Sequence, residues 1–422
     1  MNDLSNLKMR RILVVCPTSI DKRELKKFSS DYDFIFHGND VSWNIDKFDA
    51  LQYIDEVLNR FKHERIHGVI STEDYPHSII GNIVAKGLNL PHVEPDKLIL
   101  CQHKYYCRKI QKELVPEAVP MFALINQKEL KKIGMDFPFF IKPVKSFFSM
   151  HSNKVNNEKE LKDSIKEAEK HLAVFVKPFN QILKNYTNLE IDGSYMLAEE
   201  LLVGRQVTLE CFIYKNKFEL IGIVDSIMYP GTNSFQRFEY PSSLPEKVQQ
   251  RMYRITEKLM TGIGFDNGIF NIEMFYNPKT DDINIVEVNP RLCQQFADLM
   301  EKVNGTNTYG IQIALSLGDK PKTKNNSGDY KVAASFVLRE FKDGKATKVP
   351  IESQIERLTK KFPDARLDLF IQEKGTVLSE YLGKGESYVY ARINLGGKDK
   401  ENLFKKFEEA KKYLTYEFSE IN

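Results

Sequence analysis

The sequence predicts a multidomain protein with α/β and α+β units, and three stretches of the chain carry this prediction. Residues 1–103 alternate short β-branched runs with helical stretches, which is typical of an N-terminal βαβ domain with a small parallel sheet. Residues 195–289 alternate polar and apolar side chains over long strands, which indicates a mixed or antiparallel central sheet. Residues 326–422 hold short strand patterns and a helix, which predict a small C-terminal α+β domain.

The elements of the first half follow from apolar spacing. In the N-terminal unit we expect strands at 12–16 and 68–71 and helices near 47–62 and 77–88. A boundary close to residue 103 ends this unit, and Pro116 and Pro120 then break the chain. The next unit opens with an apolar strand at 139–143 and continues with a charged helix near 158–170.

The second half is rich in strands. Long strands over 195–228 precede an amphipathic helix near 244–263, and two more strands follow at 268–276 and 282–289. The polar and turn-rich segment 321–328 is a predicted linker. Beyond it we expect strands near 331–339, 366–371 and 388–394 and a helix at 399–415.

Composition and charge exclude several classes of protein. Apolar residues make up 42% and charged residues 28% of the chain, an ordinary globular balance. The net charge is +3, with 61 basic and 58 acidic residues spread along the chain, so neither nucleic acid nor a membrane is expected as a partner. The longest apolar run near the start, residues 12–15, is too short for a signal-peptide core or a membrane span. Because the five scattered cysteines are typical of reduced thiols, we expect a cytoplasmic protein.

The most informative pattern is a pair of strands that each carry a glutamate and an asparagine. Alternation places Asn271 and Glu273 on one face of the first strand. In the second strand Glu287 and Asn289 share a face, while the valines between them point away. Both strands therefore present oxygen-bearing side chains on a single face.

A hairpin with a loop at 278–282 would place Tyr276 opposite Asn284 and Glu273 opposite Glu287. Carboxylates that face each other on neighbouring strands are destabilising unless something neutralises them. Mg²⁺ prefers carboxylate and carbonyl oxygens and shares its remaining positions with substrate phosphates. Two other interpretations stay open on the pattern alone: both glutamates lie on a solvated face, or the register differs by one residue.

These strands belong to a longer series of motif residues. In chain order the series is Lys142 before Pro143, Glu199-Glu200 before Gly204, Glu273, and Glu287-Val-Asn-Pro-Arg291. In this order and at these separations the residues resemble the ATP-grasp superfamily, and most of all its carboxylate-amine ligases and biotin-carboxylase-like members. The resemblance covers about residues 104–318, and the preceding βαβ unit is similar to the domain that usually comes before.

The resemblance implies a domain organisation and a place for ATP. An N-terminal domain at 1–103 would precede a small lid subdomain at 104–200 and a large subdomain at 201–325, and 326–422 would form the C-terminal domain. ATP would lie between the lid and the larger sheet.

The resemblance also implies roles for single residues. Lys104 and Lys142 would contact nucleotide phosphates, where ammonium groups suit dispersed negative charge. Glu199 and Glu200, with the backbone around Leu201 and Leu202, would form the hinge that reads adenine.

Other roles concern the sugar, the metal and the reacting phosphate. Gln206 stands where many relatives place a ribose-binding glutamate, and an amide can hydrogen-bond a ribose hydroxyl; Glu210 is a further candidate nucleotide contact. Arg291, with Lys142, would be catalytic and grip the γ-phosphate or the acyl phosphate. The metal ligands implied are Glu273, Glu287 and Asn289.

Two stretches depart from the family pattern. The loop 144–155 contains no glycine, although relatives use small residues there to cradle phosphates. Hydroxyls of Ser146, Ser149 or Ser152 and the charges of Lys145 or Lys154 are the groups that could replace it. Residues 292–295 read Leu-Cys-Gln-Gln where relatives often have glycine, so the acceptor substrate cannot be inherited from the family.

The predicted function is an ATP-dependent carboxylate-amine ligase that forms an amide or peptide-like bond through an acyl phosphate and releases ADP and phosphate. It would use ATP with Mg²⁺ or Mn²⁺, act on a small-molecule carboxylate and an amine, and have a homodimer as one expected assembly. Two alternatives remain: a biotin-carboxylase-like enzyme that activates bicarbonate, and a nucleotide-binding protein with little catalysis.

Two further motifs have competing interpretations. Residues 63–67, His-Glu-Arg-Ile-His, match the zinc-protease pattern, but they close a helix and run into a strand, which favours a solvated helix end. Arg237 is expected in a loop on the substrate side, either as a surface residue or as an acyl-phosphate contact.

Overall fold

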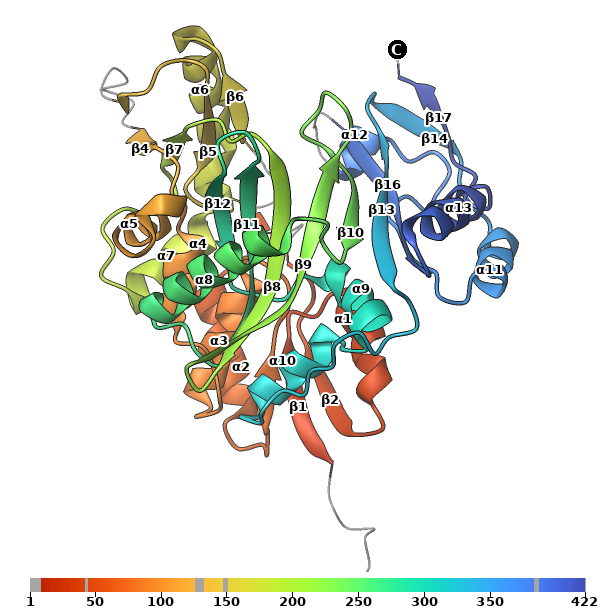
Figure 1. Cartoon of the computed structure of the whole chain (residues 1–422). Helices are drawn as coiled ribbons and strands as arrows, with labels where there is room; N and C mark the ends of the chain where they lie inside the picture. Colours follow the sequence, from red (N-terminus) through yellow and green to blue (C-terminus); the bar gives the residue numbers. More distant parts are fainter. Residues whose placement is uncertain (1–8, 42–44, 126–132, 147–150, 383–386, 422) are drawn as a thin grey trace, which may run out of the picture.

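The computed structural model describes residues 9–41, 45–125, 133–146, 151–382 and 387–421 (Figure 1). Figure 1 shows the N-terminal elements at the base, the long strands through the centre and the C-terminal elements to the right. In this part of the chain no helix has both the length and the apolar character needed to cross a membrane. The predicted fold class, α/β and α+β in one chain, is confirmed.

The N-terminal elements form a small parallel sheet, as predicted, and its strand order is β2-β1-β3. The central strand β1 is buried from Ile12 to Val15. Two elements of this sheet layer were not predicted. The helix α1 starts with a capping box between Thr18 and Asp21. The residues of strand β2 are all partly or fully exposed. The elements are β1 (Arg10–Val15), α1 (Ser19–Leu25), β2 (Tyr32–His37), α2 (Ala50–Phe61), β3 (Gly68–Ile70) and α3 (His77–Gly87).

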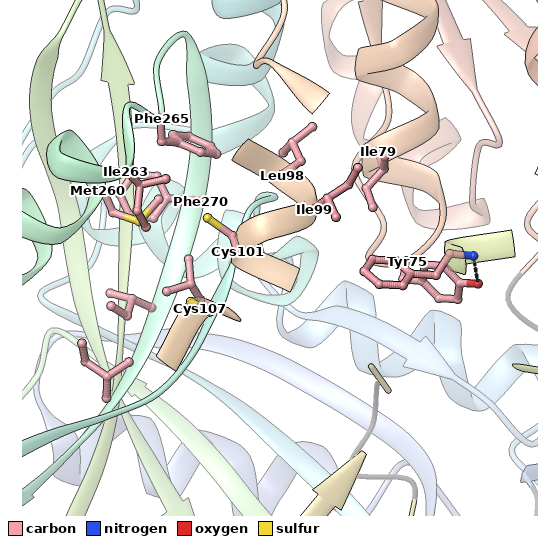
Figure 2. Packing of buried hydrophobic residues seen from close by; sticks show 14 of the residues in the cluster. Tyr75, Ile79, Leu98, Ile99, Cys101, Cys107, Met260, Ile263, Phe265 and Phe270 are labelled. Carbon is pink, nitrogen blue, oxygen red and sulfur yellow. Dashed lines mark hydrogen bonds between the residues drawn. The ribbon is translucent and has the colours of Figure 1, made fainter. Parts of the chain in front are cut away.

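Two helices, α4 (Pro95–Gln102) and α5 (Lys104–Leu114), connect this domain to the rest of the molecule. Their apolar side chains belong to one large core that also includes α3 and the central sheet. Figure 2 shows α4 between Ile79 of α3 on one side and Phe270 and Met260 on the other. Close packing on both sides holds the first residues of α5 in a fixed position.

The lid is a small antiparallel sheet in the order β4-β7-β5-β6, with helices α6 and α7. The predicted apolar strand at 139–143 is β5, and the predicted charged helix is α6, which extends further than expected. The elements are β4 (Phe122–Ile125), β5 (Phe139–Pro143), β6 (Asn153–Val155), α6 (Glu158–Phe175), α7 (Lys177–Tyr186) and β7 (Met196–Glu199).

The central sheet has eight strands in the order β12-β11-β8-β9-β10-β13-β16-β15, and every neighbouring pair is antiparallel. The sheet continues past residue 325, because β10 pairs with β13 of the C-terminal portion. Its strands are β8 (Arg205–Tyr214), β9 (Lys217–Met228), β10 (Phe235–Tyr240), β11 (Gly268–Asn277), β12 (Asp282–Asn289), β13 (Val332–Glu340), β15 (Arg366–Leu369) and β16 (Tyr388–Gly397).

Helices cover this sheet on both sides. Phe336 of β13 stacks on Phe407 of α13 with ring centroids 3.8 Å apart, which anchors the C-terminal core. The strands β14 (Gly344–Lys348) and β17 (Glu417–Glu420) form a separate pair. The helices are α8 (Glu246–Ile263), α9 (Gln294–Asn304), α10 (Thr308–Ser316), α11 (Glu352–Lys361), α12 (Leu378–Leu382) and α13 (Lys400–Lys411).

The hairpin of β11 and β12 has the predicted pairing at one end and a different register at the other. Glu273 faces Glu287, as expected from the alternation. The prediction that Tyr276 faces Asn284 is wrong, since Tyr276 pairs with Ile283. Between the two positions the register shifts by one residue, so that Val286 forms a β-bulge without a partner on β11.

Candidate active site

The paired carboxylates lie on a face of the central sheet that is rich in side-chain amides. The Nε2 of Gln206 donates a hydrogen bond to Glu273 Oε2 at 2.8 Å. The Nδ2 of Asn289 donates to Asn271 Oδ1 at 3.1 Å and to Glu273 Oε1 at 3.4 Å. Because its amide nitrogen is used within the protein, the amide oxygen of Asn289 remains as an acceptor for another group.

The two glutamates have opposite pKa shifts. Burial, and then the neighbouring charge of Glu287, raises the pKa of Glu273 to about 7. Burial alone would also raise the pKa of Glu287, but Lys104 and Lys142 lower it. Protonation is therefore easier at Glu273 than at Glu287, whose carboxylate is the more available to a cation.

These residues fit a hard divalent cation. The donor set of Glu273, Glu287 and Asn289 consists of oxygens alone, the ligands that Mg²⁺ and Mn²⁺ prefer. Two opposed carboxylates at one point of the sheet have a physical reason to attract positive charge. Within the described ranges, His, Cys, Asp and Glu side chains nowhere gather in groups of three or more suited to a metal ion.

A buried ion-pair cluster lies beside this pair. Lys142 Nζ is 2.7 Å from Glu199 Oε2, and Arg108 Nε is 2.7 Å from Glu199 Oε1. All three side chains are almost fully buried. Although burial opposes ionisation, Arg108 and Lys142 lower the pKa of Glu199 to about 2. The carboxylate of Glu199 is thus engaged by two cations and holds Lys142 in place.

The β-bulge of β12 connects this cluster to the acidic pair. The carbonyl oxygen of Val286 accepts hydrogen bonds from Arg108 Nη2 at 2.7 Å and from Lys142 Nζ at 3.3 Å. A bulged residue leaves its backbone groups outside the strand ladder, and here two cations bind the carbonyl that is set free. The bulge therefore fixes Glu287, the next residue, relative to Lys142 and Arg108.

Sequence reasoning missed Arg108, although a signal was present. Lys104 and Arg108 are four residues apart on α5, so both side chains lie on one face of the helix. Lys104 Nζ is 3.4 Å from Glu287 Oε2 and donates to the backbone oxygen of Ser146 at 3.3 Å. A basic pair on one face of a helix, next to predicted acidic strands, would have identified both residues.

Arg291 extends the site toward the N-terminal domain. Its Nη2 is 3.0 Å from Asp74 Oδ2, and Asp74 follows strand β3 in the parallel sheet. Asp74 also lies 3.6 Å from Lys145 Nζ. Burial lowers the pKa of Lys145 to about 8, whereas Lys145 and Arg291 lower the pKa of Asp74. Asp74 was also missed, although ligands commonly bind at the carboxyl ends of parallel strands.

The segment after β7 has the backbone chemistry expected of a nucleotide hinge. The N–H of Glu200 donates to Met121 O at 3.0 Å. Among the residues that the structure describes, the N–H groups of Leu201 and Leu202 donate to no protein acceptor. Donors in this position remain available for the edge of a base.

Glu210 lies on the same sheet face as Gln206 and is fully buried. Its Oε1 accepts from the N–H of Cys293 at 2.8 Å, and burial raises its pKa to about 8. Its contact is with the turn after Arg291, so Glu210 links that turn to the sheet.

The remaining sequence expectations concern the loop 144–155, Arg237 and the motif at 63–67. In the loop 144–155, Lys145 and the backbone of Ser146 belong to the site, Lys154 is exposed on β6, and Ser149 lies outside the described residues. The expectation that Arg237 lies in a loop is wrong. Arg237 lies on β10, pairs with Glu239 at 2.6 Å and stacks over Phe404 of α13. The motif at 63–67 follows the end of α2, and His67 Nδ1 accepts from the N–H of Arg11.

Comparisons with known proteins agree with this geometry. Residues 135–300 match the family model of the ATP-grasp domain. The carbamoyl phosphate synthase large chain of Thermoanaerobacter sp. (strain X514) is 22% identical over 293 residues, which are 67% of this chain and 25% of that protein. The chain spans less than half the length of each of the first three curated relatives that it matches.

Two solved structures have the same overall architecture. The L-amino acid ligase from Bacillus licheniformis superposes with a TM-score of 0.73 at 14% identity, covering 98% of this chain and 99% of that one. A biotin carboxylase–β,γ-ATP complex from Campylobacter jejuni gives a TM-score of 0.64 at 15% identity, covering 98% and 93%.

A four-stranded lid opposite a long antiparallel sheet that carries paired acidic residues is the ATP-grasp fold. Residues 135–300 carry the ATP-grasp domain, and the resemblance to the ATP-grasp superfamily that the motif residues predict is confirmed.

Proposed function

We propose that the chain is an ATP-dependent carboxylate-amine ligase that forms an amide or peptide-like bond through an acyl phosphate, with release of ADP and phosphate. The observation that supports this function best is the pairing of Glu273 with Glu287, within reach of Lys104 and beside Lys142. Opposed, partly exposed carboxylates with adjacent lysines suit a triphosphate and its counter-ion better than they suit a structural core.

The protein residues would act mainly by binding and positioning. The N–H groups of Leu201 and Leu202 would read adenine, and Gln206 would hydrogen-bond the ribose. Lys104 and Lys142 would exchange part of their contact with glutamate for the β- and γ-phosphates. Glu199 would keep Lys142 charged and oriented while this exchange takes place, and Arg108 would hold the carboxylate of Glu199 in position.

Two bond changes complete the reaction. An oxygen of the substrate carboxylate attacks the γ-phosphorus, the bond to the β–γ bridging oxygen breaks, and ADP leaves. The amine then attacks the acyl carbon, the bond to the phosphate oxygen breaks, and phosphate carries away the proton that the amine releases. Arg291 would stabilise the charge on the transferred group. Mg²⁺ or Mn²⁺ held by Glu273, Glu287 and Asn289 would neutralise phosphate charge.

The proposal includes the assembly and the division of the chain. We place the unit limits at 1–103, 104–200, 201–325 and 326–422, and expect small-molecule substrates and a cytoplasmic homodimer. Sedimentation of the purified chain tests the homodimer.

The proposed reaction is tested by ADP release from ATP in the presence of pooled organic acids and amines. We expect release to require an acid and an amine together. Glu287→Gln should lower the rate by about 100-fold or more, because charge stabilisation in the transition state is lost. Glu356→Gln on the exposed face of α11 is the matched control and should leave the rate unchanged.

Other results would redirect or contradict the proposal. ADP release that depends on bicarbonate, with no response to organic acids, would favour the biotin-carboxylase-like alternative. Undiminished turnover in Glu287→Gln, with folding intact, would remove the metal assignment.

A further inference from the structure

A second polar cluster lies where the C-terminal strands meet the start of α9. The pairing Arg366↔Asn394 and Asp368↔Arg392 places these four side chains on one face of β15 and β16. Ser335 of β13, which pairs with Asn394, joins the same face. The opposite face carries the apolar residues that pack under α13. A polar face at a buried junction of this kind needs partners for each of its groups.

The partners of this cluster are incomplete. Asp368 is 2.8 Å from Arg23 Nη2 and 3.0 Å from Arg392 Nη2. Arg366, with 8% of its side chain exposed, lies 3.4 Å from Glu24 Oε1. Yet among the described residues the Nε groups of Arg366 and Arg392 have no acceptor, and neither has Nε of Arg291. A buried donor without a partner costs about 1–3 kcal/mol, so three of them in one region indicate an acceptor that the protein itself does not supply.

Two of the three arginines contact one short segment of chain, and Arg291 lies just before this segment in the sequence. Arg291 is four residues before Gln295, so their Cα atoms are at most about 14 Å apart. Arg366 Nη2 donates to the backbone oxygen of Gln294 at 3.4 Å, and Arg392 Nη1 donates to Gln295 Oε1 at 2.9 Å. This segment opens α9, whose N-terminal end adds partial positive charge.

The free donors of the cluster suit one carboxylate. Arg366 and Arg392 each keep one Nε donor without an acceptor among the described residues, and a carboxylate offers two oxygens to accept from them. Asn394 Oδ1, buried without a donor, gives the cluster one acceptor as well.

We propose that Arg366, Arg392 and the first turn of α9 bind a second carboxylate of the acid substrate, the one that does not react, so that the acid substrate is a small dicarboxylate. This inference rests on the proposed ligase function, in which Arg291 holds the reacting end. The acid is assigned in preference to the amine because the activated carboxyl group must lie at Arg291, and the cluster begins within a few residues of it.

The test compares acids that differ only in the charge of the far group. ADP release and denaturation midpoints are measured with succinate against succinamate, glutamate against glutamine, and aspartate against asparagine. We expect the dicarboxylate of the productive pair to have a KM about 10- to 100-fold lower than its amide, the range of a hydrogen-bonded charge. Arg392→Gln should remove this preference, raise the KM for the dicarboxylate and leave kcat within about threefold.

Arg357→Gln, on the exposed face of α11, is the matched control and should keep the preference. If Arg392→Gln does not fold, the wild-type protein still tests the inference, because a dicarboxylate must raise its denaturation midpoint more than the corresponding amide does.

Three results would overturn the inference without touching the ligase function: equal KM values for acid and amide, an Arg392→Gln effect on the KM of the amine alone, or equal midpoint shifts. If no acid supports ADP release, the proposed function fails separately, and the midpoint comparison still tests the carboxylate site.

Discussion

Arg108 differs from Arg366 and Arg392 in how many of its guanidinium nitrogens have a hydrogen-bond acceptor. Arg108 has a partner for each nitrogen: Glu199 for Nε, Gln111 for Nη1 and the Val286 carbonyl for Nη2. Arg366 and Arg392 each have an acidic partner, but each leaves Nε without an acceptor in the described part of the chain.

This difference separates two uses of the same side chain. A guanidinium that has a protein acceptor at each of its three nitrogens fixes the geometry of the groups it contacts, here the bulge beside Glu287. A guanidinium that is oriented by one carboxylate and keeps a free donor is ready for an anion from outside. The two groups should therefore respond differently to the same substitution.

The largest effect is expected for Arg108→Met. The substitution leaves the buried carboxylate of Glu199 with Lys142 as its sole cationic partner, and breaking a buried ion pair from one side costs about 3–5 kcal/mol. Urea unfolding should show a loss of this size, against no significant change for the exposed control Arg254→Met. A loss below about 1 kcal/mol would contradict the assigned structural role.

The second effect is a dependence of stability on pH. The pKa of Glu199 is lowered to about 2 in the folded protein from an ordinary value of 4.5. Its ion pairs therefore stabilise the fold fully above pH 4.5, and this contribution is lost as pH falls from 4.5 toward 2, by up to about 3 kcal/mol. The slope of unfolding free energy against pH should be shallower in Glu199→Gln.

If that variant does not fold, carboxyl NMR titration of glutamate-labelled wild-type protein measures the pKa directly. A Glu199 pKa near 4.5 would show that Arg108 and Lys142 do not act on it as the distances require.

The smallest effect is expected for Arg366→Met in the absence of substrate. The substitution removes an ion pair with Glu24 and a hydrogen bond to the Gln294 carbonyl, but Glu24 keeps two cations, Lys27 at 3.0 Å and Arg23 at 3.4 Å. Because the buried carboxylate is not left unpaired, the full cost of a broken buried ion pair is avoided, and urea unfolding should show a loss of about 1 kcal/mol or less. A cost equal to that of Arg108→Met would erase the distinction between the two groups.

Local patterns in the sequence predicted the acidic pair correctly. Period-2 alternation placed both glutamates on one face, because the face on which a strand residue lies depends only on its position. Their direct opposition was derived from an assumed loop at 278–282, whose register is one residue off at Tyr276 and is restored at Glu273 by the bulge. The bulge at Val286 could not be predicted in this way. Its extra residue is stabilised by Arg108 and Lys142, which come from distant parts of the chain and are invisible to a local pattern.

The pairing of strands that are far apart in the sequence was not predicted either. The stretch 234–241 contains polar residues and was interpreted as a loop, yet it forms β10 because β9 and β13 pair with it on either side. For the same reason the C-terminal strands were predicted only as part of a small α+β domain, whereas three of them extend the central sheet. The arginine cluster depends on that extension, so no motif in the sequence pointed to it.

The junction between β10 and β13 has a practical consequence for work with fragments. A fragment that ends before residue 326 would lose β13, β16 and β15 and leave β10 with a row of unpaired backbone groups. Exposed edge strands of this kind form hydrogen bonds with strands of other chains and promote aggregation. Expression trials of the matched ATP-grasp segment alone should therefore yield insoluble material, and recombinant study of this protein needs the C-terminal portion attached.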